Sequence, residues 1–287
     1  MNGNRMFPEL HVEKEQSDKG GILGMSLAMD RVLSLVVLLS VGALALWQMR
    51  RWKNSDEELT VRKISALEAI PELIGRAVEM GRPIHFTSGV GKIDNEFAPQ
   101  TLASVEILGH IARVSAQYDA NLIVSVAPPL VYPLQREAVR AGYVAAGKAE
   151  KFSEDRVRFL SDNQMAYASA AVGIVQREKA AANIMIGAFY AEALLIAEAA
   201  LHSGAVQIGG TARMQQVPFL AVVSDYLLIG EEMFVGGAYL SRDRAKLGAI
   251  RGQDISKLIV LASLAIGGLL GLLHNDAMVQ ILKKYGN

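Results

Sequence analysis

The sequence predicts a mixed α/β fold in which a mainly parallel sheet, covered by helices on both faces, lies between two membrane-spanning helices. Two observations lead to this fold class. Short β-rich runs alternate with longer Ala-rich helical stretches through the middle of the chain, which is the pattern of a parallel sheet with crossover helices. The chain is 51% hydrophobic, and two long uncharged runs near its ends account for the excess, as membrane helices would.

Within residues 31–53 lies the first uncharged run, VLSLVVLLSVGALALWQM, after a polar segment, residues 1–30, that we predict to be a flexible extension. Its 18 residues span about 27 Å, close to the hydrocarbon thickness of a bilayer. Trp47 and Trp52 stand at its far end, where an interfacial belt would hold them. A buried core helix and a cleaved signal peptide are the alternatives, and the basic residues that follow favour a retained anchor.

The middle region, residues 54–256, alternates strands and helices and is expected to form a Rossmann-like, doubly wound domain. Pro99 suits the first turn of a long helix, because the N–H that proline lacks has no partner there. Gly81 ends the helix before the first strand, and Ser161 with Gln164 has the form of a capping box. Six strands are predicted, at Ile84–Thr87, Leu122–Ala127, Val157–Leu160, Ile184–Gly187, Ala205–Gly209 and Tyr226–Ile229.

Within residues 257–274 lies the second uncharged run, LIVLASLAIGGLLGLL, which predicts a second membrane helix, with a buried hairpin or re-entrant segment as the alternative. Gly267 and Gly271 form a Gly-x-x-x-Gly pair, which allows another helix to approach closely and favours self-association. Apolar residues recur at helical spacing beside two lysines in residues 275–287. That pattern predicts an amphipathic tail on the membrane surface.

Lysine and arginine gather on one side of each predicted span. These residues are Arg50, Arg51, Lys53, Arg242, Arg244, Lys246, Arg251 and Lys257. By the positive-inside rule they place residues 54–256 in the cytoplasm and both termini outside, in a cell inner membrane with two spans.

Composition excludes several classes of function. Lys and Arg total 29 and so do Asp and Glu, so the chain has no overall field to attract nucleic acid. The absence of cysteine excludes disulfides, a thiol nucleophile and Cys-based metal sites. The five histidines are scattered, so no metal site is predicted, and the motifs of common hydrolases and metalloproteases do not occur.

The candidate ligand-binding residues follow the predicted strands, because ligands of doubly wound sheets bind outside the carboxyl ends of the strands. They are Ser88, Lys92, Glu192, Gly209, Gly210, Thr211 and Glu231. The segment from Ser88 to Lys92 superficially resembles a phosphate loop. However, Phe86 stands where that motif needs a glycine, and Ile93 replaces its Ser or Thr. A tight anion-binding turn and an ordinary loop are both consistent with it.

Two glycines followed by Thr211 end the fifth predicted strand and could let the backbone approach an anion at a helix start. The alternative is that Gly209 and Gly210 serve only the turn and close helix packing. Glu192 and Glu231 begin helices, where they could pair for acid–base work or hold a hard cation. The alternative is a carboxylate that simply interacts with the helix dipole.

The chain resembles an uncharacterised prokaryotic membrane-anchored family in four stretches, HFTSG, NIMIGAFYAEALLIAEAA, AVQIGGTA and YLLIGEEMFVGGAYLS. The resemblance covers about residues 64–270 and is most specific in the GAF-x-AEALL and LIGEE segments. It implies an N-terminal membrane helix, an α/β domain and a C-terminal hydrophobic segment. It implies no catalytic residue and no cofactor.

These observations favour an integral membrane protein that presents its cytoplasmic domain as a scaffold, assembly or ligand-sensing module. Membrane lipid and a homo-oligomer or other membrane proteins are the expected partners, with no nucleic acid. The alternative is a membrane-anchored enzyme for a small anionic or nucleotide-like substrate in the strand-end crevice, with its cofactor and catalytic residues unknown. An open pocket between Glu192, Thr211 and Glu231 would favour the enzyme, and a crevice filled by side chains would favour the scaffold.

Overall fold

The computed structural model describes residues 32–53 and 63–272. The predicted N-terminal extension and amphipathic tail lie outside the described residues. The chain divides into two compact units, of which the larger is Trp47–Gly252. This larger unit contains the whole α/β fold.

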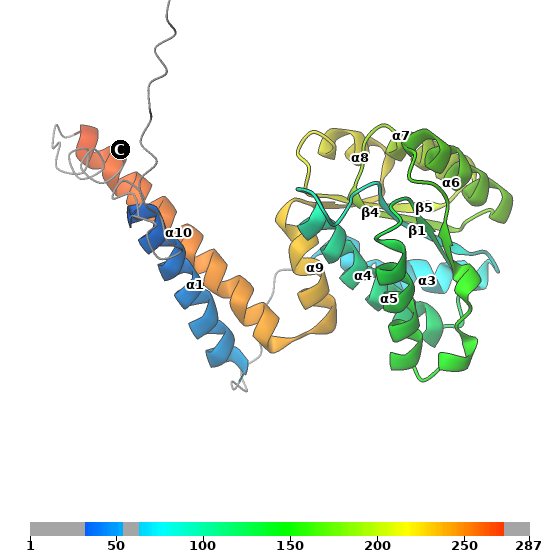
Figure 1. The fold of residues 1–287 in the computed structure, drawn as a ribbon, viewed down its shortest axis with the longest axis horizontal. Coiled ribbons are helices and arrows are strands. Elements are labelled where there is room, and N and C mark those ends of the chain that lie inside the picture. The colour runs from blue at the N-terminus through cyan, green and yellow to red at the C-terminus, as the bar shows by residue number, and fades with distance from the viewer. Residues whose placement is uncertain (1–31, 54–62, 273–287) are drawn as a thin grey trace, which may run out of the picture. The chain divides into compact units, whose positions relative to one another are not determined.

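Six strands form a single parallel sheet in the order β3-β2-β1-β4-β5-β6. Figure 1 labels β1, β4 and β5 of this sheet. The strands are β1 (Ile84–Gly89), β2 (Leu122–Val126), β3 (Val157–Phe159), β4 (Ala182–Ala188), β5 (Val206–Thr211) and β6 (Tyr226–Ile229). Each predicted strand is present, and the predicted α/β class is confirmed. The order is that of the doubly wound dinucleotide-binding folds, in which the chain changes direction between β1 and β4.

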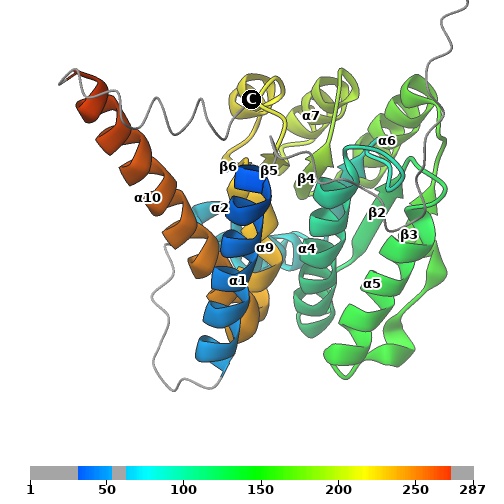
Figure 2. The same ribbon diagram turned by 60° about the vertical axis from the view of Figure 1, so that its left-hand side comes forward.

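Helices cover both faces of the sheet (Figure 2). On one face lie α2 (Ser65–Glu68), α3 (Ile70–Glu79), α4 (Ala98–Gln117), α5 (Tyr132–Ala145) and α9 (Glu231–Ser241). On the other lie α6 (Gln164–Glu178), α7 (Glu192–His202) and α8 (Val217–Val223). Short 3-10 turns at Ala149–Lys151 and Glu154–Arg156 lead into β3. Every residue of β1, β2 and β4 is buried, which explains why these strands read as nearly continuous apolar runs.

Local signals account for several helix ends. A proline lies in the first turn of α4 as predicted, and Gly81 follows α3 with a φ of 61°, a conformation that glycine adopts without steric cost. The capping box predicted for Ser161 and Gln164 is wrong. Asn163 caps α6 instead, because its Oδ1 accepts the N–H groups of two first-turn residues at 3.1 Å each. The Ser161 hydroxyl oxygen accepts the N–H of Asn163 at 3.1 Å and so braces the cap itself.

A line of buried polar side chains crosses the face of the sheet that α6, α7 and α8 cover. The Ser125 hydroxyl is 2.9 Å from Nε2 of His85, and Nδ1 of His85 is 2.8 Å from Oδ1 of Asn183. Asn183 Nδ2 donates to Oε1 of Gln207 at 3.1 Å, and Gln207 Nε2 donates to the carbonyl of Ala197 in α7 at 3.1 Å. Since an amide oxygen only accepts, His85 donates from Nδ1 and accepts at Nε2. Each member therefore has its partner while the imidazole is neutral.

Burial lowers the pKa of His85 from its ordinary value of 6.5 to about 4. The hydrogen bond to Asn183 opposes this shift, and the nearby positive charge of Arg158 adds to it. The lowered pKa and the hydrogen bonds both indicate a neutral imidazole. A second proton, on Nε2, would point at the Ser125 hydroxyl group, which already donates its hydrogen to Nε2. His85 is therefore a neutral structural residue of the sheet.

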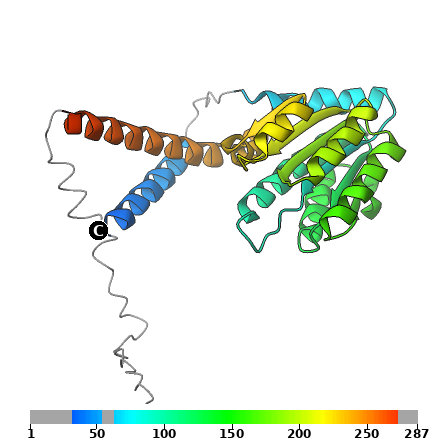
Figure 3. The same cartoon turned by 90° about the horizontal axis from the view of Figure 1, so that it is seen from above.

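The helices at the two ends of the described chain are α1 (Val32–Lys53) and α10 (Arg244–Leu272). Within them, Leu35–Lys53 and Arg244–Leu269 are long and apolar enough to cross a membrane, judged by length and composition alone. The uncharged run within residues 257–274 is thus part of a longer helix, α10, which continues without a break from its basic first turns (Figure 3).

The two tryptophans have different surroundings. Trp47 is 54% exposed, with the Arg51 guanidinium 5.4 Å from the centre of its ring. Trp52 is only 7% exposed, and its Cβ packs so closely on Gly248 that a Cβ at that glycine would lie only 2.9 Å away. Trp52 therefore joins the last turns of α1 to the first turns of α10 by packing.

Candidate functional site

Buried polar side chains fill the end of β1, where a doubly wound fold would bind a ligand. Thr87 Oγ1 is hydrogen-bonded to the phenol of Tyr167 in α6. Ser88 Oγ accepts from Nε2 of Gln135 in α5 at 2.5 Å. All four side chains are completely buried. Each hydroxyl at the end of β1 is therefore already held by a helix of the domain.

The phenol of Tyr167 stays protonated in this setting. Burial raises its pKa above the ordinary value of 10.0, and the nearby Glu192 contributes in the same direction, whereas the hydrogen bond between Tyr167 and Thr87 opposes the shift. A buried phenol of raised pKa is a poor general base at neutral pH. Tyr167 therefore joins α6 to β1 through a neutral hydrogen bond.

Glu192 begins α7 and is completely buried. Its Oε1 accepts the N–H of Tyr190 at 2.9 Å, and its Oε2 accepts from Nε2 of Gln164 at 2.5 Å. One carboxylate oxygen thus holds the turn between β4 and α7, and the other holds the first residue of α6, so Glu192 links the two. The structure gives Glu192 the role of a bracing residue at a helix start, where the helix dipole also favours a carboxylate.

The structure does not bring Glu192 and Glu231 together as a carboxylate pair. Glu231 is exposed at the start of α9, after β6, and β5 lies between β4 and β6. Two strand spacings amount to about 10 Å. Within residues 32–53 and 63–272, no group of three His, Cys, Asp or Glu side chains could hold a metal ion.

Gly209 and Gly210 do not follow the fifth strand, and their predicted position in a turn is wrong. Both lie inside β5, paired with β4 and β6, and Thr211 is its last residue. A Cβ at Gly209 would lie 2.4 Å from Oγ of Ser224. The glycine therefore makes room for the segment after α8, and its backbone N–H belongs to the sheet rather than to a helix start.

The backbones of β1 and β4 close the switch point between them. Gly89 has a φ of 74°, and the N–H of Val90 donates to the carbonyl of Ala188 at 3.0 Å. A Cβ at Gly89 would lie 2.3 Å from that carbonyl oxygen. From α4, Gln100 Nε2 donates to the carbonyl of Gly187 and, at 3.1 Å, to Oγ1 of Thr211. Backbone and side-chain groups thus pair with one another at the switch point, where doubly wound folds bind ligands.

An arginine stacked on two aromatic rings covers this closed end. The guanidinium of Arg213 lies 4.3 Å from the ring centre of Tyr190 and 4.8 Å from that of Phe97. Its Nη1 donates to the carbonyl of Phe189 at 3.2 Å. The two rings meet edge to face with centroids 6.2 Å apart. Such contacts hold the loops after β1, β4 and β5 together.

The predicted site residues therefore separate into two groups. Ser88, Glu192, Gly209, Gly210 and Thr211 are buried within the fold, whereas Lys92 and Glu231 are exposed. Ser88 is part of β1, and β4 lies between β1 and β5, the strand that contains Gly209, Gly210 and Thr211.

Sequence reasoning missed the residues that close the strand ends. Gln100 and Gln135 each lie shortly after a proline, in the first turns of α4 and α5, with a side chain turned to the sheet. The sequence did contain a signal for these two residues, namely a polar side chain on the apolar side of the first turn of a helix. Arg213 gave no such signal, because only the strand order places it near the other two loops.

Comparison with known proteins finds a family but no characterised relative. No curated protein and no solved structure matches the chain. One family model, described as a domain of unknown function (DUF6754), matches residues 24–282, which include both uncharged runs and the entire α/β fold. The chain belongs to this family, DUF6754.

Proposed function

We propose that this protein is a membrane-anchored scaffold whose cytoplasmic α/β domain serves assembly rather than catalysis. The proposal rests on the burial and the hydrogen bonds of the polar groups at the carboxyl ends of the strands. The hydroxyls of β1, the Glu192 carboxyl group and Thr211 are all buried and hydrogen-bonded within the fold. An active site at that position would need these groups to face a pocket.

The apolar side chains of the two end helices support a membrane anchor. Leu38 and Leu39 in α1 are 69% and 62% exposed, and Leu261 and Leu264 in α10 are 62% and 66% exposed. Leaving so many large aliphatic groups in water would be unfavourable by about 1.5–3 kcal/mol for each side chain. A bilayer, or burial against other membrane helices, removes that cost.

A reporter fused after Asn287 should behave as external, and one inserted after Gly147 should behave as cytoplasmic. The reason is the excess of Lys and Arg that faces residues 54–256 from both spans. Gly147 follows α5, is exposed and has open space around it. Paired alkaline phosphatase and fluorescent reporters would measure this. A cytoplasmic signal at the C-terminus would contradict the crossing of α10.

The second candidate function is that of an enzyme for an anionic or nucleotide-like substrate. Two basic residues near the strand ends support it. Lys92 is exposed and Arg213 is half-buried, so both could still meet an anion if the loops around them opened. For this function, the rings of Tyr190 and Phe97 would first have to move away from the Arg213 guanidinium.

Native mass spectrometry of the detergent-purified full chain separates the two candidates. The scaffold proposal predicts native masses equal to those of the chain and its oligomers, with no retained small molecule. It also predicts that titration calorimetry detects no heat of binding for ATP, NAD or inorganic phosphate. A retained or bound anion whose affinity falls in Arg213→Ala and Lys92→Ala, but not in Lys63→Ala as a control, would instead contradict a role in assembly alone and favour the second candidate.

A further inference from the structure

The short helix α8 presents an apolar ridge on the outside of the domain. Leu220 faces inward and is completely buried, whereas Val222 and Phe219 are 86% and 49% exposed. Residues 214–224, which contain α8, include no charged side chain. Exposed apolar surface with no charge in it marks an interaction site more often than a solvated face.

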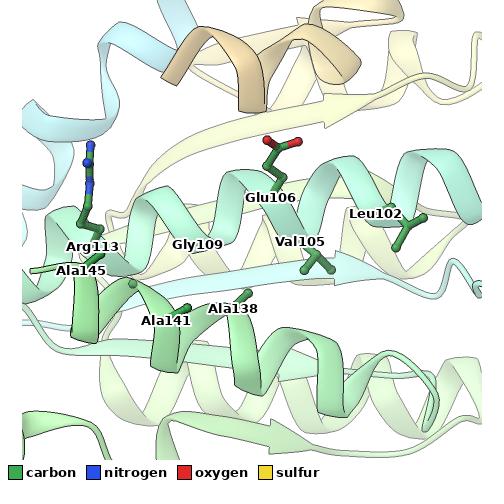
Figure 4. A pocket seen from close by; sticks show the side chains of 9 residues that line it. Leu102, Val105, Glu106, Gly109, Arg113, Ala138, Ala141 and Ala145 are labelled. Carbon is green, nitrogen blue, oxygen red and sulfur yellow. The ribbon is translucent and has the colours of Figure 1, made fainter. Parts of the chain in front are cut away.

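An apolar groove of about 400 Å³ lies between α4 and α5, on the opposite face of the sheet (Figure 4). Its lining includes Glu106, Gly109, Arg113, Ala138, Ala141 and Gly142. The two helices approach closely, because a Cβ at Gly142 would lie 2.7 Å from the carbonyl oxygen of Gly109. The small side chains around this contact leave the hollow.

We infer that the ridge on α8 of one copy of this chain packs into the α4–α5 groove of a second copy. Their lengths match, since the seven residues of α8 extend about 10 Å, as does the stretch of α4 between Glu106 and Arg113. Both surfaces are apolar in the middle, so neither loses the hydration of a charge when they meet.

The charges at the ends of the two surfaces are complementary. Arg213 precedes α8 and Asp225 follows it, while Glu106 lies toward the start of α4 in the groove and Arg113 toward its end. Laid parallel to α4, α8 brings each charge to one of opposite sign. Three of these charges also have partners within their own copy. Glu106 pairs with Lys246, Arg213 Nη1 donates to the carbonyl of Phe189, and Asp225 Oδ2 accepts the N–H of Gln207. The charges therefore set the alignment more than the strength.

The scarcity of basic residues argues against two other occupants of the ridge. Binding to an anionic membrane surface or to nucleic acid uses several Lys and Arg side chains at the contact, and residues 213–225 contain only Arg213. A second copy of the chain needs no such charge, because its groove supplies the apolar surface.

The two surfaces differ from one another and lie on opposite faces of the sheet, so each copy can use both at once. Contacts of this head-to-tail kind close into rings or continue as lines. The inference rests on the proposed assembly role and deepens it by naming the partner and the two contact surfaces.

Cysteine cross-linking of the full chain in native membranes tests this directly, because the natural chain has no cysteine. Val222→Cys and Ala141→Cys place one thiol on the exposed ridge and one at the exposed edge of the groove. When the two single variants carry different epitope tags and are co-expressed, a short bis-maleimide should yield a dimer that contains both tags. The double variant should yield a ladder or a closed ring of copies.

Each single variant expressed alone should give no cross-link, since Val222 does not meet Val222 in this arrangement. Ala149→Cys, exposed beyond the end of α5, replaces Ala141→Cys as the matched control and should abolish the mixed dimer. A dimer of Val222→Cys alone, or no mixed dimer at all, would overturn the inference. Membrane fractionation and native mass spectrometry of the same samples test the proposed scaffold role separately. A membrane-bound protein with no retained small molecule would leave that role standing even if this contact is wrong.

Discussion

Replacing Gly89 by alanine should destabilise the α/β domain by about 3 kcal/mol, lowering its thermal midpoint by roughly 6–12 °C. Two costs add. A φ of 74° is unfavourable for a residue with a Cβ, by about 1–2 kcal/mol. The new methyl group would also lie 2.3 Å from the carbonyl oxygen of Ala188 and 2.7 Å from the ring of Phe189, and such overpacking costs about 1–3 kcal/mol.

Gly81→Ala is the matched control for this change. Gly81 also has a positive φ, 61°, but a Cβ there would meet nothing within 4 Å. It should therefore lose only the backbone cost, about 1–2 kcal/mol. Thermal unfolding of both variants and the wild type in one detergent gives the comparison. Equal losses in the two variants would mean that β1 and β4 separate readily, and the closed switch point would no longer support the scaffold proposal.

The strands β1, β2 and β4 could be predicted because the sheet is covered on both faces and all of their residues are buried. Strand β4 reads ANIMIGA, and all of its residues are buried, so burial leaves a nearly continuous apolar signal in the sequence, interrupted by Asn183. The last strand residues were harder to place. In β5, two glycines look like the start of a turn, but Gly209 stays in the strand because Ser224 occupies the space beside it. The neighbour that explains the glycine lies fifteen residues away in the chain.

The candidate site depended on long-range order that local patterns do not contain. The strand order places β5 between the strands that precede Glu192 and Glu231, so two helix-start glutamates of similar appearance have different surroundings. Glu192 is completely buried and Glu231 is exposed. Likewise, Tyr167 in an Ala-rich helix gives no sign that its phenol reaches Thr87 across the sheet face.

The second large effect concerns His85, whose pKa of about 4 lies below the ordinary 6.5. Between these two values the unfolded chain binds a proton at this side chain and the folded chain does not. The free energy of unfolding should therefore be highest above pH 6.5 and should fall as the pH decreases towards about 4. The difference between these two pKa values corresponds to about 3 kcal/mol. His110, half-buried, also has its pKa lowered to about 4, and it adds a smaller contribution in the same direction.

His85→Gln should reduce this pH dependence while lowering stability at neutral pH. Glutamine has a donor and an acceptor for the polar line but gains no proton in acid, so of the contributions from His85 and His110 the second alone should remain between pH 6.5 and about 4.5. Thermal midpoints of the wild type, His85→Gln and His110→Gln across this range would measure the slopes. The slope should fall most in His85→Gln. An unchanged slope in that variant would show that the buried imidazole accepts a proton without loss of the fold, and that the polar line tolerates a charge at its centre.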